Sequence, residues 1–179
     1  MVESNKAMSS IGFRLMKFMF KVRDLLGPRL DVLKEAEIEY GFSVLDFGCG
    51  PGGYIMPLVE LVGPSGKIYA LDMHPLAIRE VKRIAANKEI ENIYTIESDG
   101  GTGLPDNCVD TVLLFDVFHD LARPDDVLRE LHRILKPSGT LSFSDHHMKE
   151  EQVLARVTAA SLFRFVRKGK KTYSFAKAY

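Results

Sequence analysis

Short apolar runs alternate with amphipathic helical segments from Ser43 to His146, and no other property of the sequence restricts its fold as strongly. This pattern predicts an open, doubly wound α/β sheet with right-handed crossovers. Pro137-Ser138-Gly139 is expected to end the helix over residues 125–136 before the fifth strand begins. The expected strands are residues 42–47, 67–72, 92–97, 109–115 and 140–146, and the expected helices are 54–62, 75–88, 125–136 and 149–162.

The two ends of the chain add further elements to this sheet. Residues 163–168 and 171–177 flank Gly169 as in an antiparallel hairpin, which brings the sheet to about seven strands. The stretch from Ile11 to Leu26 predicts an amphipathic helix. At 179 residues the chain is about one domain in size, and we divide it into a helical cap over residues 1–41 and a binding domain over 42–179.

The formal net charge of zero conceals an acidic body between two basic ends. Residues 1–30 carry six basic and two acidic side chains, residues 31–151 carry 11 and 22, and residues 152–179 carry seven and none. A net charge of zero argues against a protein that binds nucleic acid through the electrostatic field of the whole molecule. It does not exclude a local basic contact at either end.

Three interpretations of the N-terminal helix stay open, because its apolar stripe is bordered by Arg14, Lys17 and Lys21. It can form a lid over the acceptor pocket, rest on an anionic membrane surface, or form the contact of a homodimer. The sequence does not distinguish a homodimer from a monomer. For the basic tip of the C-terminal hairpin, a solvated turn is the default interpretation. Cys49 and Cys108 form no C-x-x-C motif, and with no signal peptide or membrane span in the sequence we expect a reducing, cytoplasmic setting.

Each of the first five strands has an aspartate at or near its C-terminal end. In doubly wound sheets ligands bind at the carboxyl ends of the strands, so these side chains are expected to gather at one site. A strand-end aspartate by itself is usually a helix cap or a turn residue. The five are Asp46, Asp72, Asp99, Asp116 and Asp145.

A glycine loop follows the first strand, and Gly48, Gly50 and Gly53 match the dinucleotide pattern G-x-G-x-x-G. A dinucleotide would place its pyrophosphate on the next helix, where the carboxylate of Asp46 would repel it. S-adenosylmethionine carries a sulfonium and an ammonium and no phosphate, so acidic strand ends suit it better. The loop therefore favours this cofactor over NAD(P), although an NAD(P)-binding oxidoreductase stays open as an alternative.

Five ordered motifs between residues 42 and 146 resemble those of the class I S-adenosylmethionine-dependent methyltransferases, of the type found in ubiquinone and menaquinone biosynthesis. The resemblance implies a Rossmann-like fold and methyl transfer from S-adenosylmethionine to a small-molecule acceptor. Apolar molecules are among the acceptors that it allows. The motifs are Val44–Gly53, Ala70–Met73, Ser98–Gly100, Leu104–Asp110 and Arg133–Leu141.

The resemblance also implies roles for single residues. Gly48, Gly50 and Gly52 would wrap the methionine part of the cofactor, and Asp46 would orient its ammonium. Asp72 would accept the ribose hydroxyls, Met73 would pack on the adenine, and Asp99 with Gly100 would meet the adenine amino edge. Phe115 and Asp116 would line the sulfonium end.

His119 and His146, beside Asp116 and Asp145, are the candidates for a catalytic base. Both can equally be structural histidines, and the residue types alone would also suit a metal, without any diagnostic spacing. The sequence Phe115-Asp116-Val117-Phe118 lacks the [DN]-P-P-[YF] turn of amino-methylating nucleic-acid enzymes, which disfavours a nucleic-acid substrate. A non-catalytic cofactor-binding module that contacts RNA or a membrane through its basic ends is the remaining alternative.

Overall fold

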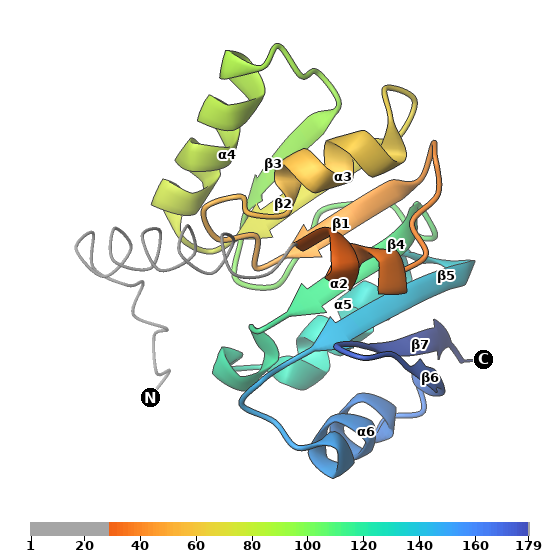
Figure 1. The fold of residues 1–179 in the computed structure, drawn as a ribbon. Coiled ribbons are helices and arrows are strands. Elements are labelled where there is room, and N and C mark those ends of the chain that lie inside the picture. Colours follow the sequence, from red (N-terminus) through yellow and green to blue (C-terminus); the bar gives the residue numbers. More distant parts are fainter. Residues whose placement is uncertain (1–28, 179) are drawn as a thin grey trace, which may run out of the picture.

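A seven-stranded sheet organises the computed structural model, which describes residues 29–178 (Figure 1). The expected helix over Ile11–Leu26, with its three interpretations, lies outside the described residues. The strands are β1 (Ser43–Phe47), β2 (Lys67–Asp72), β3 (Ile93–Glu97), β4 (Val109–Phe115), β5 (Leu135–Ser144), β6 (Phe163–Lys168) and β7 (Tyr173–Lys177). The helices are α2 (Arg29–Glu35), α3 (Ile55–Val62), α4 (Pro75–Asn87), the 3-10 helix η1 (Phe118–Asp120), α5 (Pro124–Ile134) and α6 (Glu150–Thr158).

The strand order is β3-β2-β1-β4-β5-β7-β6. Strands β1 to β5 pair in parallel, and β7 lies antiparallel between β5 and β6. This confirms the expected sheet of seven strands with an antiparallel C-terminal hairpin. The order reverses between β1 and β4, so the ends of these two strands border the crevice in which such folds bind ligands.

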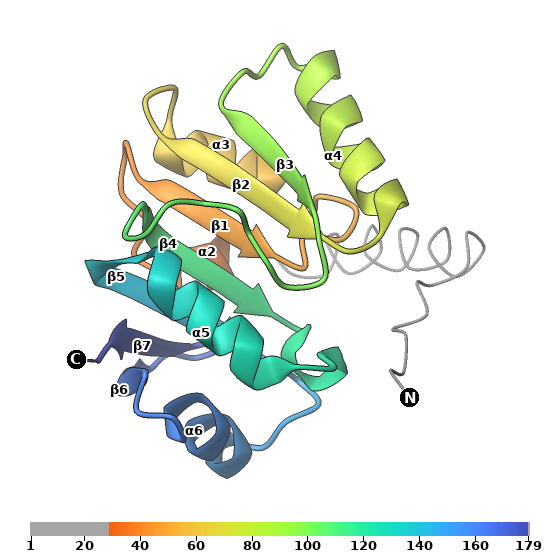
Figure 2. The ribbon, with the colours of Figure 1, turned by 180° about the vertical axis from the view of Figure 1, so that it is seen from behind.

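Helices cover both faces of the sheet. Helices α2, α3 and α4 bury Leu33, Leu58 and Val81 in one core cluster, whereas α5 and α6 bury Leu131 and Val153 in the other. Figure 1 shows α2 and α3 in front of the sheet, and Figure 2 shows α5 on the opposite face. From Val112 to Phe115, alternate residues of β4 enter alternate cores, which explains why this part of the strand is apolar.

The expected boundary at Pro137-Ser138-Gly139 is wrong. Helix α5 ends at Ile134, and β5 begins directly at Leu135, with the three residues inside the strand. Leu135 is fully buried and pairs with Val109, and the register then shifts before Thr111. The irregularity accommodates a proline, which cannot donate to a regular ladder. The sequence also predicts that the last helix extends to residue 162, whereas α6 ends at Thr158.

The turn between β6 and β7 is fastened to the C-terminal end of α2. The carboxylate of Glu35 accepts hydrogen bonds from the backbone N–H groups of Lys170, Lys171 and Thr172 and from the Thr172 hydroxyl, at 2.9–3.2 Å. Arg167 donates to the Glu35 carbonyl oxygen at 2.6 Å. The basic hairpin tip is therefore more than a solvated turn, because it ties two segments that lie about 135 residues apart.

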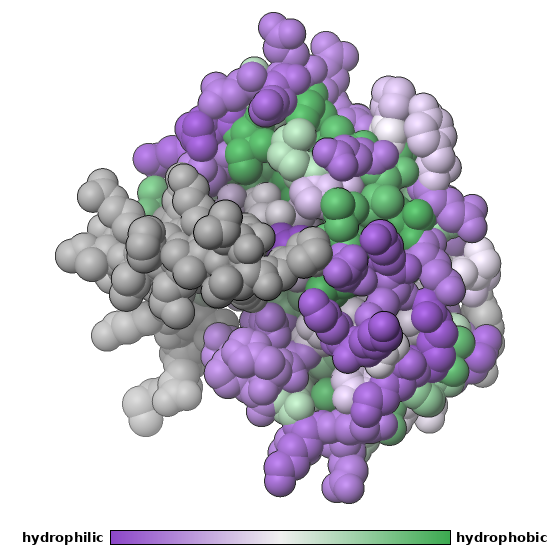
Figure 3. Space-filling view, viewed as in Figure 1, coloured by the Kyte–Doolittle hydropathy of each residue, from purple (hydrophilic) through white to green (hydrophobic). Residues whose placement is uncertain are grey.

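Hydrophobic residues on the face shown in Figure 3 gather around α3, whereas hydrophilic residues cover most of the surface around α6. The aromatic residue Tyr40 is 67% exposed, and its ring packs on Gly63 after α3. No helix within residues 29–178 is long and apolar enough to cross a membrane.

Candidate cofactor and catalytic site

The glycine loop between β1 and α3 adopts backbone conformations that side chains rarely permit. Gly48, Gly50 and Gly52 have φ angles of 78°, 51° and 79°. The N–H of Gly48 donates to the Leu71 carbonyl at 2.8 Å, which holds the loop against the end of β2. A Cβ on Gly48 would lie 2.8 Å from a methyl carbon of Val117, so the segment after β4 also packs on the loop.

Asp72, the last residue of β2, connects the glycine loop to the start of α4. Its Oδ2 accepts from the Gly50 N–H and its Oδ1 from the His74 N–H, both at 2.8 Å. Burial raises the pKa of Asp72, and these hydrogen bonds oppose that shift. Each carboxylate oxygen has a second lone pair, so Asp72 can accept two further hydrogen bonds.

A small cavity of about 80 Å³ lies between the glycine loop and the ends of β2 and β3. Three aspartates, Asp72, Asp99 and Asp120, line it, and apolar side chains provide most of the remaining wall. It brings together four of the predicted cofactor residues, Gly48, Asp72, Met73 and Asp99. The other lining residues are Phe47, Leu71, Ser98, Val117, Asp120 and Leu121.

Gly100 does not line this cavity. It borders a neighbouring one of about 250 Å³, together with Asp99 and Arg123 from the start of α5. Asp99 therefore lies between the two cavities, and its exposed carboxylate is 3.7 Å from the Arg123 guanidinium.

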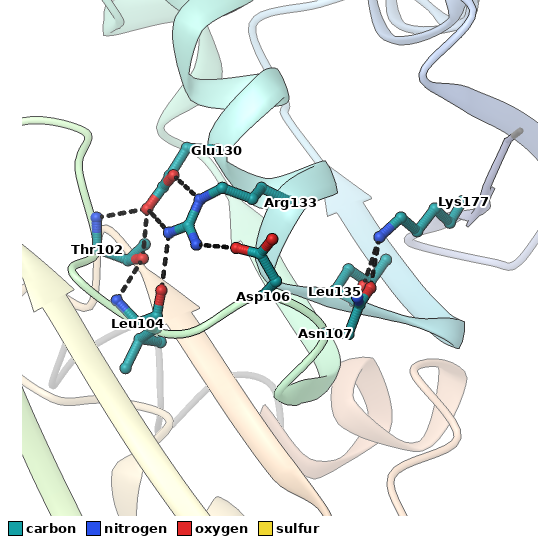
Figure 4. Close-up of polar contacts among 8 residues, drawn as sticks. All are labelled: Thr102, Leu104, Asp106, Asn107, Glu130, Arg133, Leu135 and Lys177. Carbon is teal, nitrogen blue, oxygen red and sulfur yellow. Dashed lines mark hydrogen bonds and ion pairs between the residues drawn. The ribbon is translucent and has the colours of Figure 1, made fainter.

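The loop after β3 is anchored to α5, although it contains three glycines (Figure 4). The carboxylate of Glu130 accepts from the Thr102 backbone N–H at 2.9 Å and from its hydroxyl at 2.5 Å. Arg133 holds the same carboxylate and donates to the Leu104 carbonyl at 2.8 Å. The Arg133 hydrogen bonds lower the pKa of Glu130 to about 2. Arg133 also pairs with Asp106 at 2.5 Å, so two motifs of the resemblance form one structural network.

Asp46 lies in β1 on the face that carries Val44, toward α3. The residue is 2% exposed, and its Oδ2 has no hydrogen-bond partner within residues 29–178. Burial raises the pKa of Asp46 to about 7; Arg29 opposes this shift, and Asp72 adds to it. Phe115 lies nearby at the end of β4, with its ring 5.4 Å from that of Tyr54 at the start of α3.

Two histidine–aspartate pairs cross between the ends of β4 and β5. Nδ1 of His119 lies 2.9 Å from Oδ2 of Asp145, and Nδ1 of His146 lies 2.7 Å from Oδ1 of Asp116. The backbone N–H of each histidine donates to the same carboxylate oxygen. Asp116 has a φ of 53°, a strained conformation for a residue with a side chain.

The His119 pair is the more sheltered of the two. The Asp145 side chain is fully buried, whereas His146 is 66% exposed. Burial raises the pKa of Asp145, but hydrogen bonds from His119 and His147 outweigh it and leave the pKa below its ordinary value. The carboxylate is thus ionised and accepts a hydrogen bond from the N–H at Nδ1, so in the neutral ring Nε2 is the nitrogen with the free lone pair.

His147 stands between the other two imidazoles, with ring centroids 4.1 Å from His119 and 4.0 Å from His146. Nε2 of His119 lies 3.3 Å from Asp120, whose side chain is 81% exposed. No group of three or more potential metal ligands within residues 29–178 has the arrangement of a metal site. The arrangement is suited to proton transfer at Nε2 when the exposed Asp120 moves aside.

No sequence motif indicated a role for Arg29, Val117 or Leu121, which the structure brings to the glycine loop and the small cavity. Val117 and Leu121 follow β4 closely, and the position of their segment at the sheet edge is the signal that could have identified them. Arg29 precedes β1 by 14 residues, and no motif links it to the site.

Comparison with known proteins identifies relatives. A family model described as a methyltransferase domain matches residues 38–177. The demethylmenaquinone methyltransferase of Geobacillus sp. (strain WCH70) is 28% identical over 125 residues, which are 69% of this chain and 53% of the relative. That of Listeria monocytogenes serotype 4a is 27% identical over 118 residues, 65% and 50% of the two chains. The chain thus spans about half the length of these curated relatives.

Two solved structures place the fold. A SAM-dependent methyltransferase from Aquifex aeolicus has a TM-score of 0.74 and 28% identity, with 89% of this chain and 97% of that chain covered. The [4+2]-cyclase SpnF has a TM-score of 0.67 and 18% identity, with 92% and 62% covered. The fold is therefore shared by proteins named for different reactions, and the reaction has to be argued from the site.

Proposed function

Because the chain belongs to the family of the methyltransferase domain, we propose that it transfers a methyl group from S-adenosylmethionine to a small-molecule acceptor. The observation that carries this proposal is the joint placement of Asp46, Asp72 and Asp99 around the glycine loop and the small cavity. A cationic cofactor with a ribose and an adenine suits three carboxylates at these positions, whereas a pyrophosphate would meet the buried Asp46.

The residues present fit this cofactor. The apolar lining of the cavity, including Met73 and Leu121, suits an adenine ring, and Asp99 offers an acceptor for its amino group. Asp72 keeps a lone pair on each oxygen for the ribose hydroxyls. The buried Oδ2 of Asp46 has no hydrogen-bond partner within residues 29–178 and would gain one from an ammonium group.

When bound, the cofactor supplies an electrophilic methyl group on its sulfonium. The task of the chain is then to align the acceptor with that group, exclude water and remove a proton where the acceptor carries one. Phe115 and Tyr54, whose ring centroids lie 5.4 Å apart, would border the sulfonium end. We assign His119 as the base, acting through Nε2, with Asp145 as the residue that positions its ring.

His146 and Asp116 form the second candidate pair for proton removal. Since His146 is 66% exposed, it is better placed to contact an acceptor at the rim than to accept a proton in a dry site. We therefore assign proton removal to His119 and use His146 as the comparison in mutagenesis.

The relatives named demethylmenaquinone methyltransferases supply the first acceptor to test, demethylmenaquinone in its reduced form. The new methyl–acceptor bond would form as the methyl–sulfur bond breaks, and the acceptor proton would pass to His119. S-adenosylhomocysteine and the methylated acceptor would leave as products.

The decisive experiment incubates the protein with methyl-labelled S-adenosylmethionine and a panel of small acceptors, with label transfer and product mass as readouts. Transfer to one acceptor, lost in Asp72→Asn, would support the proposal. A parallel thermal shift compares S-adenosylhomocysteine with NAD, because a ligand at 100 times its Kd stabilises a protein by about 2.7 kcal/mol. Stabilisation by NAD alone would overturn the proposal in favour of an oxidoreductase.

A further inference from the structure

Strand β3 forms one edge of the sheet, and its outer side has no neighbouring strand within residues 29–178. The carbonyl of Asn92 accepts from β2 and the N–H of Ser98 donates to β2, so the even-numbered residues of this segment bond to β2. Ile93, Thr95 and Glu97 therefore direct their backbone N–H and C=O groups outward. Such a row of backbone groups is a template on which a further strand can pair.

The opposite edge of the sheet, β6, has two protections that β3 lacks. Strand β6 carries Arg164, Arg167 and Lys168, and its pairing with β7 contains a register shift. Charged side chains and irregularities of this kind prevent further strands from adding to an edge. Strand β3 contains no basic residue and no proline, and it pairs with β2 over five residues without a shift. It is therefore the edge that can accept another strand.

One face of β3 is apolar and only partly covered. Tyr94 stacks on Tyr69 of β2, with ring centroids 5.5 Å apart, and Ile96 follows on the same face. Tyr94 is 45% exposed, and no residue of β3 is buried. The chain passes from β3 to β4 without an intervening helix, and Figure 2 shows β2 and β3 with no helix in front of them. A partner at this edge would cover an aromatic pair that the rest of the described chain leaves exposed.

We propose that β3 is a dimerisation edge, where the β3 strands of two copies of this chain pair antiparallel about a two-fold axis at Thr95. Thr95 then lies opposite Thr95 of the second copy, and Ile93 lies opposite Glu97. These are the residues that face outward, and hydrogen-bonded pairs in an antiparallel ladder exchange both of their bonds. The register thus uses every outward N–H and C=O group of both strands and joins the two sheets into one. The inference does not depend on the proposed function.

The side chains of β3 match each other in this register. On the uncovered face, Tyr94 of each copy lies opposite Ile96 of the other. These are non-hydrogen-bonded pairs, in which opposing side chains are closest, and aromatic residues pair favourably with β-branched ones there. Because the two-fold axis produces this pair twice, and Tyr69 extends the apolar band on both sides, the strand is self-complementary. This favours a second copy over an unrelated strand.

Charges on the other face are also complementary. Ile84 and Ile93 pack against the same core cluster, so the C-terminal half of α4 lies over the start of β3. The exposed Lys82 and Lys88 belong to this part of the chain, and the register brings Glu97 of the second copy to the level of Ile93. Opposite charges near each other attract, although exposed pairs contribute little each.

The two copies also bring acidic residues together just beyond β3. Glu91 of one copy comes opposite Asp99 of the other, and these carboxylates repel each other. Arg123, whose guanidinium is 3.7 Å from Asp99, provides an opposite charge at the same place.

The test measures the mass of the full chain by sedimentation equilibrium over a range of concentrations. Because one pair of edge strands is a small interface, we expect a monomer–dimer equilibrium with a Kd on the order of 10–100 µM. Thr95→Pro removes an outward N–H and no bond to β2, as prolines on edge strands do, and should raise this Kd at least about tenfold. Circular dichroism would verify that the variant is folded.

A matched pair of variants tests the uncovered face without a proline. Tyr94→Lys places a cation opposite Ile96 in both copies and should also raise the Kd at least about tenfold. Phe165→Lys makes the same kind of change at a 40% exposed aromatic residue of β6 and should leave the Kd within about twofold.

A cross-link tests the position of the two-fold axis. Opposing Cα atoms in a hydrogen-bonded antiparallel pair are about 5.5 Å apart, within the range of a disulfide. Thr95→Cys should therefore form a covalent dimer under mild oxidation. The wild-type protein, whose cysteines are Cys49 and Cys108, should form none beyond background.

Three results would overturn the inference. The first is a wild-type protein that stays monomeric up to roughly ten times the expected Kd. The second is a dimer that neither Thr95→Pro nor Tyr94→Lys weakens, since it would form through another surface. The third is a mass that keeps growing with concentration, because a two-fold contact closes at the dimer.

Discussion

Oδ2 of Asp145 accepts hydrogen bonds from both the backbone N–H and the imidazole of His119, at 3.0 and 2.9 Å. Asp145 directly follows β5, and His119 lies in η1 after β4, so two neighbouring strand ends fix one ring. A carboxylate that only accepts hydrogen bonds places the ring proton on Nδ1. The relationship therefore sets both the orientation and the tautomer of the candidate base.

Replacing either partner should slow methyl transfer without weakening cofactor binding. We expect His119→Ala to lower kcat by about 100-fold or more, since general base catalysis contributes roughly 10²- to 10⁴-fold. Asp145→Asn should cause a comparable loss because an amide can donate to Nδ1 and leave Nε2 protonated. Steady-state kinetics with the identified acceptor would measure kcat, and calorimetry with S-adenosylhomocysteine should give a Kd within about twofold of the wild-type value.

The double variant His119→Ala/Asp145→Asn should be no slower than His119→Ala alone, because the two residues act as one unit. His146→Ala is the comparison for the exposed pair and should have the smaller effect. A full loss in His146→Ala, with His119→Ala unaffected, would move the base to the second pair.

Sequence patterns predicted the elements that depend on local periodicity. The apolar run Val109–Phe115 and the alternation around Lys67–Asp72 match β4 and β2 residue for residue. The prediction failed at Pro137–Gly139, where proline and glycine usually interrupt structure. There the buried pairing of Leu135 with Val109 outweighs local preference.

The candidate site was predictable only in part, because its partners come from distant segments. Strand-end aspartates could be named from the sequence, but the crossed pairing of Asp145 with His119 and of Asp116 with His146 could not. Those pairs join residues 26 and 30 positions apart. Arg29 reaches the glycine loop only because α2 packs on α3, a tertiary contact that leaves no motif in the sequence.

Asp72→Asn should weaken the binding of every adenosine ligand. The amide keeps the shape of the carboxylate but loses its charge and one acceptor oxygen, so the glycine loop and the ribose contact are both affected. We expect the Kd of S-adenosylhomocysteine and of 5′-methylthioadenosine to rise on the order of 10- to 100-fold, measured by calorimetry. Asp125→Asn, at an exposed position in the first turn of α5, is the control. Unchanged affinities would place the ribose elsewhere.

The buried Asp46 should make stability and binding depend on pH in opposite directions. Its pKa is raised from an ordinary value of 3.8 to about 7, so the folded protein retains a proton that the unfolded chain releases. The free energy of unfolding of the ligand-free protein should therefore fall, by on the order of a few kcal/mol, as the pH rises from about 4 to about 7. Arg29 opposes this shift, and Asp72 adds to it.

Binding should follow the reverse trend, because an ammonium group requires the ionised form of Asp46. The Kd of S-adenosylhomocysteine should decrease up to tenfold per pH unit as the pH rises toward about 7, and Asp46→Asn should remove most of this dependence. 5′-Methylthioadenosine is the matched probe, since it senses Asp72 but lacks the ammonium. Parallel pH profiles for the two ligands in the wild-type protein would argue against a contact between Asp46 and the ammonium.

The carboxylate of Glu35 should stabilise the fold by joining α2 to the β6–β7 turn. It accepts four hydrogen bonds from residues 170–172, and Glu35→Ala would remove them all. We expect the free energy of unfolding in urea at pH 7 to fall by about 1–3 kcal/mol. Glu37→Ala is the control, because Glu37 is 72% exposed and makes one ion pair with Arg167, which predicts a loss below about 1 kcal/mol.

Acid should reduce the difference between the wild-type protein and Glu35→Ala. Burial raises the pKa of Glu35, but the hydrogen bonds from Lys171, Thr172 and Lys170 outweigh it and leave the pKa below its ordinary value of 4.5. The stabilisation is therefore complete above about pH 4.5 and is lost as the pH falls through the lowered pKa of the folded state. Urea unfolding at pH 7 and pH 3 measures this change. An equal difference at both values would mean that the charge on Glu35 contributes nothing to the contact.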